Sequence, residues 1–392
     1  MVFLDKEKTP ERLIEQNKEI IRPTWIEIDR AAFEHNIMSY KSIVKPALLA
    51  PVIKSNAYGH GIAPIAKICD QHESVDLICV VSLSEALLLR SQGIKKPILV
   101  LSIVDGDLDE AIAYDIDLVV YDLAMALELN HIGSMLNKKA QVHVKVDTGL
   151  SRLGLLQGEA ITFIETLHHL PFINIRGMFT HFASSESTDQ TYTNQQLENF
   201  NFVIQQIEAK GIVIPLKHTS CSAAITANLG SHFTMVRAGI GMYGLWSSDE
   251  NKQVTKENYP QFSLRSVLTW KTRVIHIKEI PADSYVGYDL TYQADKATRI
   301  ATLPVGYWDG YDRGLSNKGK VLINNHLVPI VGRVAMNLTM IDVTGLDVAV
   351  GNEVTLLGNH AGVTADDMAR HCGTINYEVV TRINPLLPRI IR

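Results

Sequence analysis

The chain has 392 residues, which is too long for one ordinary core and long enough for two domains, one of which could be a large barrel. Hydrophobic residues make up 46% of it and charged residues 20%, with no low-complexity tract, so a disordered or fibrous protein is excluded. A net charge of −5 without any block rich in lysine and arginine argues against a nucleic-acid partner. No run reaches the ~18 apolar residues of a membrane helix, so we expect no membrane partner either.

The start of the chain alternates charged residues with single apolar ones and lacks the continuous apolar segment of a secretory signal. We interpret residues 1–22 as an N-terminal extension. The four cysteines have no CxxC spacing, which favours reduced, buried thiols over a disulfide framework or a zinc site. We therefore expect a cytoplasmic location and no metal.

Short β-branched segments alternate with amphipathic segments over the first two-thirds of the chain, a pattern typical of βαβ units around a parallel sheet. The predicted strands are residues 48–54, 77–82, 97–102, 118–121, 141–147, 173–182, 216–220 and 235–240. Eight strands, each followed by a helix or a long loop, over roughly 200 residues predict a (β/α)8 TIM-type barrel. An earlier segment, residues 24–29, predicts a ninth strand that pairs outside the barrel.

Two of the intervening helices have clear sequence signals. Residues 82–92 begin with Ser82 and Glu85 at the spacing of a capping box and end before Gly93. A second helix presents one apolar face and ends at Gly211. The residues of that face are Leu197, Phe200, Ile204 and Ile207.

After about residue 258 the pattern changes to strands and turns with little helix, which indicates a separate domain. We place the α/β barrel at residues 23–258 and a mostly-β C-terminal domain at residues 259–392. Asn324-Asn325 predicts a hairpin turn, because asparagine tolerates positive φ. Residues 364–373 are expected to form the one helix of this domain.

Reactive side chains follow the ends of several predicted barrel strands, where chemistry collects in such barrels. These side chains are Lys54, Lys145, Asp147, Arg152, His181, Ser222 and Arg237. Each alone could be an ordinary residue: Lys145 and Asp147 an ion pair, His181 a core histidine, Arg237 a rim salt bridge. All of them together favour a functional site.

Lys54 follows the apolar run LLAPVI directly, which favours a partly buried amine with a lowered pKa, suited to Schiff-base chemistry. A phosphate site in such barrels usually follows strands seven and eight, and here that stretch offers Ser222 and the backbone of Gly239-Ile240. The segment GIGMYG at residues 239–244 matches GxGxxG, but it closes the barrel instead of opening a βαβ unit. It is therefore weak evidence for a dinucleotide.

Seven segments in chain order resemble the successive motifs of the alanine racemase family: VIKSNAYGHG, VHVKVDTGLSRLG, FTHF, TMVRAGIGMYGL, VGYDLTY, LPVGYWDGY and VGRVAMN. The likeness runs from about residue 22 to residue 392, and the ordered set is much more specific than any one motif. It implies a pyridoxal 5′-phosphate (PLP) dependent racemase, an isomerase that interconverts L-alanine and D-alanine with two bases. D-alanine from such an enzyme is a peptidoglycan precursor for cell-wall synthesis.

The resemblance also implies which residues bind the cofactor. Lys54 would hold PLP covalently and act as one base, and Arg237 would face the pyridine nitrogen with His181 bonded behind it. A guanidinium only donates hydrogen bonds, so the ring nitrogen would stay unprotonated, which weakens PLP as an electron sink and limits side reactions. The phosphate would be held by Tyr58, Ser222, Gly239 and Ile240.

On the substrate side, the resemblance implies that Arg152 binds the carboxylate and that Lys145, carbamylated in many relatives, orients it. Tyr288 would be the opposite base and would arrive, with Met336, from the partner subunit of a homodimer. Racemisation needs one proton donor on each face of a planar carbanion, which suits an amine and a phenol. Both have ordinary pKa values near ~10 and must be shifted toward neutrality.

Four residues depart from the commonest motifs of the family: Asp289, Ser220, Asn337 and Pro385. Pro385 stands where many relatives have a tyrosine near the substrate, and Asn337 replaces an acidic residue with a group that both donates and accepts. Together they predict a larger pocket and activity on serine beside alanine. Two other classes remain open. A PLP barrel decarboxylase would carry an acidic residue in place of Arg237, and a single-barrel PLP carrier without catalysis would lack the β domain and Tyr288.

Overall fold

The computed structural model describes residues 23–227 and 229–392, and the predicted extension at residues 1–22 lies outside this part. The chain forms two compact units. The barrel unit comprises Glu27–Thr269, Leu357–Pro385 and Arg389–Arg392; the β unit comprises Trp270–Leu356, Leu386–Pro388 and the described residues up to Ile26. The two units therefore interleave along the chain, whereas the sequence suggested a single boundary after residue 258.

Eight parallel strands form the barrel, and each overlaps a predicted strand. They are β2 (Leu48–Pro51), β3 (Ile78–Ser82), β4 (Ile98–Ile103), β5 (Ile116–Val120), β6 (Ala140–Lys145), β7 (Ile173–Phe179), β8 (Leu216–His218) and β9 (Met235–Ala238). Strands β3 to β8 pair in chain order, and β2 pairs with β9. A parallel bridge between Val52 and Cys79 joins β2 to β3, and the Arg237 amide donates to the Ser220 carbonyl oxygen between β8 and β9. The predicted (β/α)8 barrel is confirmed.

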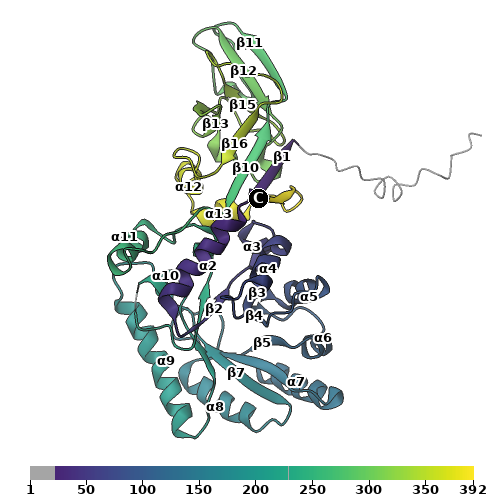
Figure 1. The fold of residues 1–392 in the computed structure, drawn as a ribbon, viewed down its shortest axis with the longest axis vertical. Coiled ribbons are helices and arrows are strands. Elements are labelled where there is room, and N and C mark those ends of the chain that lie inside the picture. The colour runs from purple at the N-terminus through teal and green to yellow at the C-terminus, as the bar shows by residue number, and fades with distance from the viewer. Residues whose placement is uncertain (1–22, 228) are drawn as a thin grey trace, which may run out of the picture. The chain divides into compact units, whose positions relative to one another are not determined.

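Helices alternate with the barrel strands along the chain, and the longer ones lie around the outside of the strands (Figure 1). The helices are α2 (Arg30–Val44), α3 (Lys54–Tyr58), α4 (Ile62–Gln71), α5 (Leu83–Ser91), α6 (Leu108–Ala113), α7 (Leu123–Leu136), α8 (Gln157–His168), α9 (Thr191–Ala209), α10 (Ser222–Thr226), the 3-10 helix η1 (Ile240–Tyr243), and α11 (Asp249–Asn258). The predicted face of α9 is buried at Phe200, Ile204 and Ile207. None of the helices within the two described ranges is long and apolar enough to cross a membrane.

Only one of the two hydrogen bonds of the predicted capping box forms at the start of α5. The Ser82 hydroxyl accepts from the Glu85 amide, as expected for an N-cap. The Glu85 carboxylate does not return to the Ser82 amide, however, because it accepts from the amides of Val81 and Ser55 at 3.0 and 2.7 Å. This side chain therefore links α5 to the segment that follows β2.

The segment 357–385 belongs to the barrel unit and carries two helices, α12 (Ala365–Cys372) and α13 (Asn376–Thr381). The expectation of one helix after residue 258, at residues 364–373, is wrong, because α13 follows α12 in this part of the chain. Helix α13 packs closely on α3: a Cβ placed on Gly59 would lie 1.9 Å from the Val380 carbonyl oxygen. A glycine is needed at this contact, where φ is also +83°.

The remaining strands form two sheets. They are β1 (Thr24–Ile28), β10 (Leu268–Arg273), β11 (His276–Ile280), β12 (Thr298–Leu303), β13 (Lys320–Ile323), β14 (His326–Pro329), β15 (Thr339–Asp342), β16 (Glu353–Leu357) and β17 (Arg389–Ile391). The sheet orders are β14-β13-β16-β10-β1-β17 and β11-β12-β15. The predicted mostly-β character is confirmed. Asn324 and Asn325 form the two-residue turn between β13 and β14, both with positive φ, as predicted.

Candidate active site at the carboxyl ends of the barrel strands

A cavity of about 590 Å³ opens in the barrel unit where the barrel strands end. Parallel strands place their carboxyl ends at one rim, so side chains far apart in sequence meet there. The cavity is lined by nine of the eleven residues that the sequence singled out: Lys54, Tyr58, Lys145, Arg152, His181, Ser222, Arg237, Gly239 and Ile240. The other two, Tyr288 and Met336, belong to the β unit.

Lys54 follows β2 and begins a short turn of left-handed helix. Ser55, Asn56, Ala57 and Tyr58 all have φ between 52° and 55°, a conformation that costs free energy for residues with a Cβ. Two side chains compensate by binding backbone amides of this segment: Glu85 accepts from Ser55, and Asn56 accepts from Ile62 at 2.9 Å. The turn directs the backbone away from the strand immediately after Lys54.

Four cations surround the cavity: Lys54, Lys145, Arg152 and Arg237. Burial, and then the charge of Arg152, lowers the pKa of Lys54 below its ordinary value. Burial, reinforced by Arg237, Arg152 and Lys54, lowers the pKa of Lys145 to about 8. Such a concentration of positive charge in a half-closed cavity favours an anionic ligand.

The ion pair that the sequence allowed between Lys145 and Asp147 does not form. The Asp147 carboxylate instead accepts from the amides of Gly149 and Ser151 at 2.9 and 3.1 Å. Lys145 is buried and its Nζ lies over the ring of Phe179, 5.2 Å from the centroid. Its amine thus stays available for contacts inside the cavity.

Ser222 and Gly239 form a cradle of polar groups at the ends of β8 and β9. The Ser222 hydroxyl accepts from the amides of Gly239 and Gly241 at 2.8 and 3.3 Å. It also bonds the buried hydroxyl of Tyr40, whose pKa burial raises. A Cβ on Gly239 would lie 2.7 Å from the Tyr58 hydroxyl oxygen, so glycine is what lets the Tyr58 hydroxyl approach this backbone. Backbone amides and hydroxyls around an open space suit a phosphate group.

Arg237 is buried and held from several sides. Its Nη1 donates to the Nδ1 and the carbonyl oxygen of His218, at 2.6 and 2.9 Å. Its Nη2 donates to the carbonyl oxygens of Thr180 and Thr219, and lies 3.3 Å from His181 Nδ1. Burial lowers the pKa of Arg237 to about 10, which leaves it charged at neutral pH. Burial, with Arg237 as the nearest contributing charge, lowers the pKa of His181 well below its ordinary value, so this imidazole is neutral and can accept.

Tyr377 on α13 also lines the cavity, and the sequence analysis missed it. Its hydroxyl donates to the Ser247 hydroxyl at 3.3 Å, and its ring lies 6.3 Å from that of Tyr58. Pro385, by contrast, is exposed and does not line the cavity. The expectation that Pro385 removes an aromatic wall is therefore wrong, because Tyr377 supplies an aromatic ring there. Pro385 therefore gives no support for serine activity, and the part that rests on Asn337, a residue of the β unit, stays a prediction.

In the β unit, Tyr288 and Met336 are exposed over 69% and 54% of their surface. Asp289, one of the departures from the family motifs, has φ of 63°, where glycine is favoured. Its carboxylate lies 3.4 Å from Arg313 and 3.3 Å from Arg333. This pair of arginines gives the aspartate a structural reason to occupy that position.

Ser220, another departure, is buried behind the cavity. Its hydroxyl donates to the Ser231 carbonyl oxygen and lies 2.8 Å from the Ser231 hydroxyl. It thus fixes a loop after β8 rather than a group in the cavity.

Comparison with known proteins agrees with this geometry. A family model described as the N-terminal domain of alanine racemase matches residues 28–247, and one described as the C-terminal domain matches residues 267–391. The alanine racemase of Methanococcus maripaludis is 39% identical over 95% of this chain and 99% of its own length. That of Clostridium perfringens is 40% identical over 95% and 96%.

Solved structures give the same result. Alanine racemase from Clostridium difficile superimposes with a TM-score of 0.90 and 36% identity, covering 95% of this chain and 97% of that one. Alanine racemase from Bacillus anthracis with bound L-Ala-P has a TM-score of 0.85 and 33% identity over 95% and 96%. Likeness of this extent in both sequence and structure is decisive: the chain belongs to the alanine racemase family.

Proposed function

We propose that this protein interconverts L-alanine and D-alanine with PLP as its cofactor. The observation that carries the proposal is the meeting of Lys54, Arg237 and the Ser222–Gly239 cradle in one cavity of a chain from this family. A lysine for covalent attachment, a partner for the pyridine nitrogen and a phosphate cradle are what PLP binding requires of a protein, and here the partner is a guanidinium.

The cavity fits PLP in charge and in shape. Ser222, Gly239, Ile240 and Tyr58 would hold the phosphate, since all four line the cavity and the absence of a side chain on Gly239 brings the Tyr58 hydroxyl beside this backbone. Lys54 Nζ would hold the cofactor covalently, and its lowered pKa makes it a better nucleophile. When bound, PLP supplies electron withdrawal that acidifies the α-proton of the amino acid.

Lys54 Nζ and the Tyr288 hydroxyl would move protons on opposite faces of the substrate. Each base serves one enantiomer, so no single side chain has to reach both faces of the substrate. The Tyr288 side chain is exposed over 69% of its surface in a single chain, and it does not line the cavity of its own barrel. We infer that a second copy of the chain brings Tyr288 and Met336 to this cavity, in a homodimer with shared active sites.

Arg152 would bind the substrate carboxylate, since it lines the cavity and a guanidinium suits a carboxylate. Lys145 would orient Arg152. A pKa of about 8 leaves part of the Lys145 amine neutral near physiological pH, which is the form that reacts with carbon dioxide to give a carbamate. A carbamate at this position would replace a repelling cation beside Arg152 with an attracting anion.

Arg237 argues for racemisation over decarboxylation. It stays charged and has no proton that it readily gives up, so it would leave a bound pyridine nitrogen unprotonated. We place the reaction in the cytoplasm, in the supply of D-alanine for the cell wall. Cys69 and Cys79 are free and buried, which suits a reducing compartment.

A chiral assay of the PLP-loaded protein over a panel of amino acids tests this proposal. We expect both enantiomers of alanine to be converted into the racemate, with alanine preferred over all larger amino acids. Conversion of alanine to an amine or a keto acid, or a preference for another amino acid, would contradict it.

A further inference from the structure

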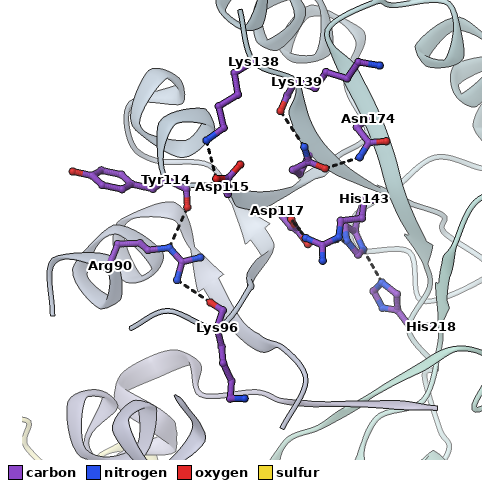
Figure 2. A network of polar contacts seen from close by, with 12 residues as sticks. Arg90, Lys96, Tyr114, Asp115, Asp117, Lys138, Lys139, His143, Asn174 and His218 are labelled. Atoms are coloured by element: carbon purple, nitrogen blue, oxygen red, sulfur yellow. Dashed lines mark hydrogen bonds and ion pairs between the residues drawn. The ribbon is translucent and has the colours of Figure 1, made fainter. Parts of the chain in front are cut away.

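A line of hydrogen bonds crosses the barrel interior and ends at Arg237. The Asp117 carboxylate on β5 lies 3.3 Å from His143 Nε2 on β6, and His143 Nδ1 lies 2.9 Å from His218 Nε2 on β8. Figure 2 shows His143 between Asp117 and His218. The second Asp117 oxygen accepts from Arg176 at 2.9 Å. The side chains of Asp117, His143 and His218 are completely buried, so water does not compete for these bonds.

The two ends of this line fix the direction of every bond in it. Because the guanidinium only donates, His218 Nδ1 accepts from Arg237 and the His218 proton lies on Nε2. His143 Nδ1 therefore accepts from His218, and its own proton on Nε2 is donated to Asp117. Both imidazoles are neutral Nε2–H tautomers. A second proton on either ring would bring two donors face to face.

The surrounding residues are shaped to hold these rings. A Cβ on Gly177, the register partner of His143 on β7, would lie 2.2 Å from His143 Nδ1. The ring of Phe179 stacks on His218 at 4.8 Å with an interplanar angle of 8°, and it also lies beneath the Arg237 guanidinium at 5.2 Å. The close approach of Gly177 to His143 and the stacking of Phe179 on His218 leave each imidazole little freedom.

The consequence appears at Arg237. The His218 ring nitrogen and carbonyl oxygen take both Nη1 donors, and the carbonyl oxygens of Thr180 and Thr219 take the two Nη2 donors, with His181 Nδ1 3.3 Å from Nη2. Within the described residues, the Nε–H is left as the one guanidinium donor without a protein partner, and Arg237 lines the cavity. The orientation of the guanidinium thus decides which donor a ligand meets.

We propose that Asp117, His143 and His218 are positioning residues that fix the guanidinium of Arg237, so that its Nε–H is presented to the pyridine nitrogen of PLP. This inference rests on the proposed function, because it assigns to Arg237 the cofactor as its ligand. Asp117 would thereby orient Arg237 through two intervening imidazoles, those of His143 and His218.

Replacing His143 separates a positioning role from a structural one. His143→Gln keeps an acceptor for His218 and a donor for Asp117, whereas His143→Leu removes both. We expect His143→Leu to lower kcat for alanine by roughly 10 to 100-fold, the range seen when a group that orients an active-site ligand is lost, with little change in KM. It should also shift the absorption band of bound PLP. His143→Gln should restore both. Asp76→Asn, which alters a half-buried carboxylate that binds Lys41 and the Leu49 amide, is the control and should change neither.

Nitrogen NMR of the cofactor-free protein provides a readout that does not depend on activity. Both His143 and His218 should show neutral rings with the proton on Nε2, and in His143→Leu the His218 signals should change. If His143→Leu does not fold, Asp117→Asn serves instead, because its amide would turn an NH2 donor toward one of the two donors, Arg176 or His143, that the two carboxylate oxygens now accept from. Equal behaviour of the Leu and Gln variants, or a protonated His143, would overturn the inference. A wild type with the expected tautomers but without racemase activity would refute only the proposed function.

Discussion

The amide nitrogen of Gly239 lies 2.8 Å from the hydroxyl oxygen of Ser222, and this contact joins the ends of two neighbouring barrel strands. Beside it, the Cα of Gly239 faces the Tyr58 hydroxyl so closely that no side chain fits between them. The hydroxyls of Ser222 and Tyr58 thus meet beside the Gly239 backbone, which makes this the part of the cavity best suited to a phosphate.

Gly239→Ala should therefore weaken cofactor binding. The added methyl group would meet the Tyr58 hydroxyl oxygen at 2.7 Å and occupy the space for a phosphate oxygen. We expect the Kd for PLP, measured by fluorescence titration, to rise at least about tenfold, which corresponds to ~1.4 kcal/mol. Gly158→Ala is the control, since nothing lies within 4 Å of a Cβ there. An unchanged Kd for Gly239→Ala would exclude the cradle as the phosphate site.

Lys54 should be the lysine that reacts covalently with PLP. Borohydride reduction of the loaded protein, followed by peptide mass mapping, should place a stable pyridoxyl group on Lys54. Lys54→Ala should lose this label and all racemase activity, whereas Lys138→Ala, which removes a surface ion pair with Asp115, should keep both. A pyridoxyl group on Lys145 in the wild type would reassign the roles of the two cavity lysines.

Lys145 should make the stability of the cofactor-free protein depend on pH. Its folded-state pKa of about 8 lies below the ordinary 10.5, so the cost of the buried charge is fully present below pH 8. That cost fades as pH rises from 8 to 10.5, because the folded protein then loses this proton before the unfolded chain does. Lys145→Met should thus raise the unfolding free energy at pH 7 by up to about 3 kcal/mol, and by much less at pH 10.5.

Urea denaturation in CO2-free buffer at both pH values would measure this effect. Lys217→Met is the matched control, because Lys217 is ion-paired with Glu208 at 3.0 Å and should show no such pH-dependent gain. A stability gain for Lys145→Met that is equal at the two pH values would point to packing rather than charge.

The sequence predicted the barrel and the convergence of its strand ends because both depend on local patterns. A lysine after an apolar run, such as Lys54, marks a strand end whatever its tertiary partners are. Contacts between segments that are distant in sequence cannot be predicted from such local patterns. Glu85 looked like half of a capping box, and only the fold shows that its carboxylate accepts from Ser55. Likewise, His143 lies in the middle of an apolar strand and meets His218 only after the barrel closes. Tyr377 belongs to a short helix in a segment expected to lie in another domain.

Tyr288→Phe should abolish racemisation while leaving PLP bound, because it removes one of the two proposed bases and nothing from the cavity of its own barrel. Exchange of the α-proton with solvent should then persist for one enantiomer of alanine only. Tyr285→Phe, which changes a neighbouring exposed tyrosine, is the control and should remain active.

The same variant tests the proposed sharing of active sites. Mixed Lys54→Ala and Tyr288→Phe subunits should recover part of the activity, since each heterodimer would contain one site with both bases. No recovery after verified subunit exchange would mean that each site is built within one chain.

The last prediction concerns substrate range, which depends on the aromatic wall that Tyr377 supplies. Tyr377→Ala should enlarge the cavity and raise the serine-to-alanine ratio of kcat/KM by about tenfold or more, since space for one methylene group is worth ~1 to 3 kcal/mol in such pockets. Because both substrates are assayed with the same PLP-loaded variant, a loss of cofactor affinity does not change the serine-to-alanine ratio of kcat/KM. Pro385→Tyr should leave the ratio unchanged, because Pro385 is exposed outside the cavity lining. If Pro385→Tyr lowers the ratio while Tyr377→Ala does not raise it, the wall of the substrate pocket is formed by the segment around Pro385 and not by α13.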